Sequence, residues 1–169
     1  WYSPLAAGSS AFIKYDGLLL DDRIMFHYYA TGITPAMAMR IIGKGSAYAM
    51  TAHDSKGHYL DGSRAYSVTL PSSIPAKDFW SFMVYDNQTR SILETDQKAG
   101  GIDGNTKSLK RNIDGSITIY FGPQAPIGKE GNWVQTMPGK GFNVLLRLYG
   151  PLESWFDKTW VPGDFELSK

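Results

Sequence analysis

From residue 46 onward, the chain consists of short segments in which apolar and polar residues alternate. Alternation with a period of two sends successive side chains to opposite faces of a β-strand. Gly, Pro and Asp separate the segments, as expected of tight turns. The spacing predicts about seven strands, arranged as an antiparallel β-sandwich. The clearest segments are 46–53, 64–70, 79–85, 116–121, 133–136 and 142–149.

Helical signals are confined to the two ends of the chain. Apolar residues in 17–30 fall partly at helical spacing, and Gly32 is a suitable end for that helix. Thr34-Pro35 has the form of an N-cap followed by proline at the first helical position, which predicts a second short helix ending near Gly43. A last short helix is predicted over 151–157.

The change of pattern near residue 45 predicts two parts. Residues 1–45 are expected to form a lead-in and helical segment, the remnant of a connector between domains, and residues 46–169 to form the sandwich. At 169 residues the chain is long enough for one domain with a sizeable core. It opens at Trp1 with no initiator methionine and no signal-peptide pattern, so we expect a larger polypeptide to precede it.

Charge and cysteine content exclude several classes of function. Seventeen basic and sixteen acidic residues give a formal net charge of +1, so no overall field attracts nucleic acid or an anionic membrane. The absence of cysteine excludes thiol catalysis, zinc–thiolate sites and disulfides. No apolar run approaches the ~18 residues of a membrane span. The aromatic content of 14% fits strands and an aromatic-lined pocket.

The segment from Lys77 to Arg90 is the first candidate site, because it combines aromatic and charged residues. Tyr85, Asp86 and Arg90 fall at a strand end, where loops gather to form pockets. The alternative is that Asp86 and Arg90 pair to close a turn while the aromatics belong to the core. Alternation places Trp80, Phe82 and Val84 on one face of the strand and Phe79, Ser81, Met83 and Tyr85 on the other.

Trp133 and Gln135, beside Asn132, form a second candidate rim for a ligand. The tryptophans near the C-terminus, Trp155 and Trp160, are instead expected to fasten the chain end to the sandwich.

Two imidazoles and two carboxylates lie within the nine residues from His53 to Asp61 and could bind a borderline metal. Asp54 and Gly57 have the composition of turn formers, and the stretch lacks the ligand spacing of a calcium loop. We therefore expect no metal and no other cofactor, with His53 and His58 as the only candidate ligands.

Signatures of common catalytic sites are missing. The chain has no Gly-x-Ser-x-Gly nucleophile turn, no phosphate-binding loop and no His-x-His pair of the kind that binds metal in jelly-roll enzymes. Sequence alone leaves open a serine triad on another geometry or a pair of catalytic carboxylates. No catalytic residue is assigned.

Six motifs in order along the chain resemble the domain of unknown function 1214, over about residues 25 to 165. They are Thr31-Gly-Ile-Thr-Pro-Ala-Met37, Pro75-Ala-Lys-Asp-Phe-Trp-Ser81, Val84-Tyr-Asp-Asn-Gln-Thr-Arg90, Tyr120-Phe-Gly-Pro123, Asn132-Trp-Val-Gln-Thr136 and Leu146-Arg-Leu-Tyr-Gly-Pro-Leu152.

The resemblance implies a jelly-roll-like β-sandwich. It also implies that a first domain, domain of unknown function 1254, and a helical connector precede this chain in a two-domain bacterial protein. Some relatives carry secretion signals, which is compatible with an exported or periplasmic location. The family supplies no substrate and no catalytic residues.

These observations together predict a non-catalytic β-sandwich module that packs on its missing N-terminal domain and forms a homo-oligomer. Its aromatic pocket is expected to bind a small or saccharide-like ligand. The alternative is a hydrolase whose site lies at the interface with the missing domain and uses Tyr85, Asp86 or Arg90.

Overall fold

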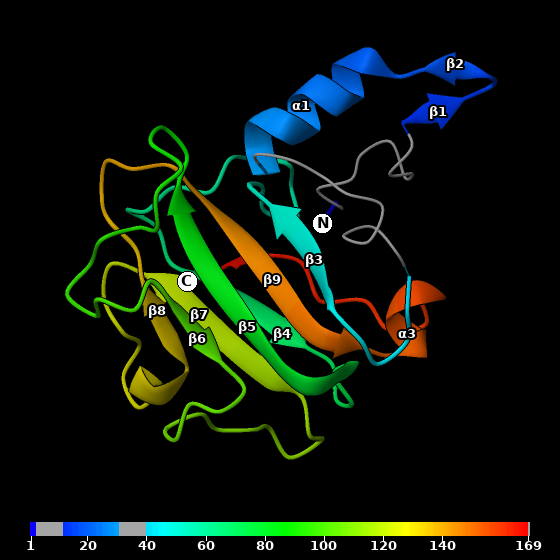
Figure 1. Cartoon of the computed structure of the whole chain (residues 1–169). Coiled ribbons are helices and arrows are strands. Elements are labelled where there is room, and N and C mark those ends of the chain that lie inside the picture. The colour runs from blue at the N-terminus through cyan, green and yellow to red at the C-terminus, as the bar shows by residue number, and fades with distance from the viewer. Residues whose placement is uncertain (3–11, 31–39, 169) are drawn as a thin grey trace.

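The computed structural model describes residues 1–2, 12–30 and 40–168, and its body consists of two four-stranded β-sheets that face each other (Figure 1). The first sheet has the strand order β3-β9-β5-β6. Its strands are β3 (Ser46–Thr51), β9 (Phe142–Pro151), β5 (Ala76–Asp86) and β6 (Gly101–Asp103). The second sheet has the order β10-β4-β7-β8. Its strands are β10 (Glu166–Leu167), β4 (Tyr66–Leu70), β7 (Ile117–Gly122) and β8 (Trp133–Gln135).

The prediction of a mainly β fold with antiparallel sheets is confirmed, with one departure. All pairings in the first sheet are antiparallel, as are those of β4 with β7 and β10. Strand β8 pairs with β7 in the parallel direction, because the connection over 123–132, which ends in the short 3-10 helix η1 (Glu130–Asn132), returns the chain before β8 begins. Neither sheet closes into a barrel.

The core lies between the two sheets and is made by the alternate residues of their strands. In β5, the alternation predicts that Trp80, Phe82 and Val84 share one face, and all three are buried. Phe82 meets Phe121 of β7 across the interface, with the ring centroids 5.7 Å apart and the rings nearly perpendicular. Edge-to-face packing of this kind stabilises a pair of aromatic rings beyond the burial of their apolar surface.

Both ends of the described chain contribute to this core. Trp1 stacks on Phe82 at 6.0 Å, and its indole N–H donates a hydrogen bond of 2.8 Å to the carbonyl of Gly163. Trp155 and Trp160 are buried as the sequence predicts, and the short helix α3 (Glu153–Phe156) carries the first of them. The lead-in predicted as merely extended therefore includes a partly buried tryptophan that packs against the core.

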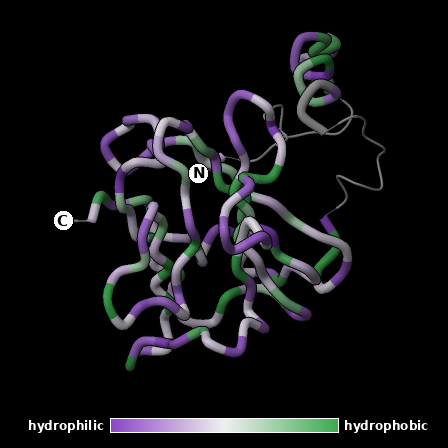
Figure 2. Tube along the Cα trace, turned by 90° about the vertical axis from the view of Figure 1, so that its left-hand side faces the viewer, coloured by the Kyte–Doolittle hydropathy of each residue, from purple (hydrophilic) through white to green (hydrophobic). Residues whose placement is uncertain are grey.

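A hairpin and a helix precede the two sheets. Strands β1 (Ile13–Lys14) and β2 (Gly17–Leu18) form the hairpin, and α1 (Leu20–Ala30) follows it. Figures 1 and 2, two views at right angles, both show these elements standing apart from the sheets. The helix predicted over 17–30 thus begins later than expected. The second predicted helix falls largely outside the described residues, and 40–45 are turns and irregular backbone. No helix in the described ranges combines the length and hydropathy needed to cross a bilayer.

Candidate functional site

The face of the first sheet that points away from the core carries aromatic and polar side chains together, and we call it the outer face. Strands β5 and β9 lie side by side there, and their outward residues are partly buried except for Ser81, which is buried. Strand β3 adds Tyr48, the most exposed of these aromatics. The outward residues of the two central strands are Phe79, Ser81, Met83 and Tyr85 on β5, and Asn143, Leu145, Arg147 and Tyr149 on β9.

An aromatic stack with an arginine beside it occupies one end of the outer face. The rings of Phe79 and Tyr149 are 4.2 Å apart at an angle of 12°, because their backbones are directly paired across β5 and β9. The guanidinium of Arg147 lies 5.1 Å from the centre of the Tyr149 ring and donates a hydrogen bond to the Tyr149 hydroxyl. Cation–π contact and hydrogen bond together fix the orientation of Arg147.

A row of polar residues crosses all four strands of this sheet. The strand register aligns Tyr48, Arg147, Ser81 and Asp103 in that order. The hydroxyl of Tyr48 shares a 2.7 Å hydrogen bond with Ser46 at one end of the row. The Asp103 carboxylate at the other end accepts a 2.8 Å hydrogen bond from the backbone N–H of Asn105.

Ser81 is the buried member of this row. The residue is 5% exposed, and its hydroxyl oxygen has no hydrogen-bond partner among the described residues. Native proteins satisfy most buried polar groups, so such an atom calls for an explanation, of which a ligand or a bound water is one. The outer face therefore contains a buried hydroxyl, that of Ser81, whose hydrogen-bonding capacity is not satisfied by the described residues.

Arg147 also lacks a carboxylate partner. In the described part of the chain, three cation–carboxylate contacts lie within 4.0 Å, and Arg147 takes part in none of them. They are His58–Asp54, Arg64–Asp61 and Lys140–Asp86. The positive charge of a partly buried guanidinium is thus available to an external anion.

Tyr85 and Asp86, two of the predicted site residues, leave β5 in opposite directions. Tyr85 is partly exposed on the outer face, whereas Asp86 is buried at the rim of the core. Neighbouring strand residues alternate between faces, so these two side chains cannot converge on one ligand while β5 stays a strand. Arg90 follows in the turn at the end of β5, with a φ of 60°, and its backbone N–H donates to the carbonyl of Asp86 at 2.8 Å.

Asp86 is committed to contacts within the protein. Its carboxylate binds the ammonium of Lys140 at 2.8 Å and accepts backbone N–H groups from Gln88 at 2.7 Å and Thr89 at 3.3 Å. The Lys140 ammonium first, and then these N–H groups, hold the pKa of Asp86 below its usual value. The turn is closed in this way by Lys140 and by backbone hydrogen bonds.

Trp133 and Gln135 lie on the other sheet, on its outward side. Trp133 donates its indole N–H to the carbonyl of Gly122 at 2.9 Å, and Gln135 donates its amide to Asp96 at 3.1 Å. The side chain of Gln97 binds the free edge of β8: it donates to the Trp133 carbonyl at 3.1 Å and accepts the Gln135 backbone N–H at 2.7 Å. The structure therefore does not bring this pair together with Tyr85.

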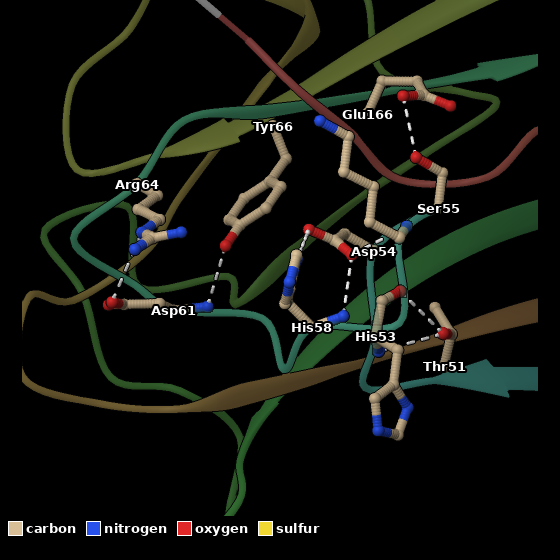
Figure 3. A network of polar contacts seen from close by, with 10 residues as sticks. Thr51, His53, Asp54, Ser55, His58, Asp61, Arg64, Tyr66 and Glu166 are labelled. Carbon is tan, nitrogen blue, oxygen red and sulfur yellow. Dashed lines mark hydrogen bonds and ion pairs between the residues drawn. The ribbon is translucent and has the colours of Figure 1, made fainter.

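His53 and His58 flank a tight turn, and their rings point in different directions (Figure 3). The ring of His53 packs on Tyr59 at 4.4 Å, whereas His58 contacts the Asp54 carboxylate at 3.4 Å. Burial opposes ionisation of Asp54, but the backbone N–H groups of His58 and Lys56 and the His58 ring lower its pKa. No group of three or more potential metal ligands occurs in the described ranges.

Arg147 and Tyr149 were missed by reasoning from the sequence. The signal that could have found them is the alternation in Phe142–Pro151, which puts a cation and a tyrosine on the same face of an otherwise apolar strand. Their pairing with Phe79 and Ser81 depends on the register of two strands far apart in the chain, which no local pattern contains.

Comparisons with known proteins place the chain in a family. The VPA0106 protein from Vibrio parahaemolyticus has a similar structure, with a TM-score of 0.68 and 23% identity over 88% of this chain and 35% of that one. A putative uncharacterized protein from Burkholderia cenocepacia gives a TM-score of 0.42 and 19% identity over 79% of this chain and 32% of its own. This chain thus spans about a third of either one.

No curated protein matches the chain. The likeness to the Vibrio protein shows a shared fold. The family described as "Protein of unknown function (DUF1214)" matches residues 45–153, which include both central strands of the outer face. Since that match covers more than half of the sequence, the chain belongs to the DUF1214 family.

Proposed function

We propose that this chain is a jelly-roll-like β-sandwich module that binds a saccharide-like ligand on its outer face. The observation that carries the proposal is the stacked Phe79–Tyr149 pair beside the polar row through Arg147 and Ser81. A sugar ring has an apolar C–H surface that packs on an aromatic ring and hydroxyls that need fixed donors and acceptors. Jelly-roll sandwiches are a frequent scaffold for such sites in lectins.

The test is a binding titration of the chain against a panel of neutral and acidic oligosaccharides by isothermal titration calorimetry. Tyr149→Ala should weaken binding at least tenfold, because truncating a central aromatic at an interface commonly costs more than about 1–2 kcal/mol. Tyr59→Ala is the matched control, since Tyr59 is 72% exposed on the turn beside His53. Equal affinities for the two variants would count against the outer face as the site.

We further propose that the β1–β2 hairpin and α1 pack on another domain of the same polypeptide. Apolar side chains are exposed across both elements, with Tyr15 the most exposed at 92%. The others are Ile13, Leu18, Leu20, Ile24 and Met25. Several exposed apolar side chains on neighbouring elements are typical of an interface that has lost its partner.

The chain alone should therefore self-associate through this surface. Light scattering coupled to size-exclusion chromatography should show a molar mass that rises with concentration. The double change Leu18→Gln with Ile24→Gln should restore the monomer mass. A wild-type chain that remains monomeric at all concentrations would refute the proposal.

The hydrolase alternative stays a prediction. Its residues Tyr85 and Asp86 point to opposite faces of β5, and no observation favours it over binding.

A further inference from the structure

We infer that the saccharide bound by the outer face is acidic and that Arg147 receives its carboxylate. The inference rests on the proposed function and deepens it, because it names the class of sugar. It starts from the charge of the one arginine in the polar row, and from the lack of any carboxylate paired with it within 4.0 Å in the described ranges.

The guanidinium of Arg147 has a fixed orientation that suits a planar anion. It is fixed by the ring and the hydroxyl of Tyr149, so little side-chain freedom is lost when a ligand binds. A guanidinium presents several N–H groups in a fork that matches the two oxygens of a carboxylate. Partial burial strengthens such a pair relative to one in open water.

Ser81 supports the same assignment from the neighbouring strand. Its backbone is paired directly with that of Arg147, and its buried hydroxyl has no partner in the described structure. Neighbouring side chains cover this hydroxyl, so it can donate to an acidic group, or to a water that the acid holds, once one of them moves aside. On the far side of Arg147, the Tyr48 hydroxyl offers another donor.

The negative charge of Asp103 limits the orientation of the sugar on the outer face. Its carboxylate is two strands away from Arg147, about 10 Å at the usual spacing of strands, and would repel an acid placed above it. The acid group is therefore expected over β9 and β3, near Tyr48. The sugar hydroxyls then extend over Ser81 toward Asp103, where a carboxylate can accept their hydrogen bonds.

The experiment compares two probes that carry a single acidic position and differ by its charge and one methyl group: a methyl glucuronoside and its methyl ester. Both are titrated calorimetrically into the wild-type chain, Arg147→Gln and the control Arg64→Gln. Arg64 is a fitting control because it is an exposed arginine with a carboxylate 3.8 Å away, and it lies in the turn before β4 of the second sheet. Circular dichroism checks that each variant keeps its fold.

The wild-type chain should bind the acid about 10- to 100-fold more tightly than the ester, the range expected for a charge-assisted hydrogen-bonded pair. Arg147→Gln should abolish this preference, and Arg64→Gln should keep it. If Arg147→Gln fails to fold, Arg147→Lys replaces it; this variant retains the charge without the fork and should show an intermediate preference.

Equal affinity of the wild-type chain for the acid and the ester would overturn the inference and leave saccharide binding intact. A preference for the acid that survives Arg147→Gln would overturn it as well. Failure of the wild-type chain to bind either probe or any sugar of the wider panel would overturn the inference together with the proposed function.

Discussion

Asn132 offers a test of how the loop at 107–111 is held against β7. The side chain is buried, at 6% exposure, and makes three hydrogen bonds to backbone. Its oxygen accepts the N–H of Lys110 at 2.7 Å, and its amide nitrogen donates to the carbonyls of Lys110 at 2.8 Å and Thr118 at 2.9 Å. Asn132→Asp keeps the shape of the side chain but replaces the donating amide nitrogen with an oxygen. The carbonyls of Lys110 and Thr118 then face an atom that cannot donate to them.

A carbonyl left without a donor costs up to about 1–3 kcal/mol, so the two partly buried carbonyls together should lower the free energy of unfolding by about 2–6 kcal/mol at most. Domains of this size have a total stability of about 5–15 kcal/mol, so the loss should be large. Urea unfolding at pH 7, followed by tryptophan fluorescence, measures it.

The matched control is Asn112→Asp in the exposed continuation of the same loop. The Asn112 amide donates to the hydroxyls of Ser116 at 2.9 Å and Thr118 at 3.0 Å, where water can replace it. This change should cost no more than about 0.5 kcal/mol. Equal losses for the two variants would show that burial of Asn132 is not what makes its hydrogen bonds important.

Three further outcomes are expected. Gly62→Ala should strongly destabilise the fold in thermal melts, because an added Cβ would lie 2.1 Å from the carbonyl oxygen of Met137, whereas Gly122→Ala meets nothing nearer than 3.4 Å. The Lys140 ammonium lowers the pKa of Asp86 from 3.8 in the folded state, so the pair contributes stability above about pH 4 that is lost as the pH falls through the lowered value. Asp86→Asn should accordingly show a smaller decline between about pH 5 and pH 2 in urea titrations, and an unchanged decline would contradict the assignment. Gln97→Ala should free the edge of β8 and cause concentration-dependent association by light scattering, while Gln88→Ala in an exposed turn should not.

The long strands were predictable because their signal is local. Alternation in 79–85 and 142–149 located the two central strands and placed Phe82 on the same face as Trp80 and Val84. The structure shows that this face points into the core. Short elements were missed for the opposite reason. Strand β6 has three residues inside a polar, glycine-rich connection, and it exists because β5 supplies its hydrogen bonds.

The candidate site was harder to predict, because it depends on which strands become neighbours. Alternation already placed Tyr85 and Ser81 on one face of β5. The partner on that face, Arg147, comes from a strand more than fifty residues later, and only the register of β5 with β9 brings it opposite Ser81. Its charge made Asp86 a candidate site residue, but its carboxylate is bound by Lys140 and by two backbone N–H groups.

The position of β9 between β3 and β5 has a consequence for biosynthesis. Ribosomes release β3 and β5 well before β9, whose residues from Val144 onward must pair with Thr51 and Val84. Until then, two strand edges stay open, and such edges recruit other chains. Formation of this sheet is therefore expected to wait for β9 and to be slow, and nascent chains halted before Phe142 should depend on holding chaperones.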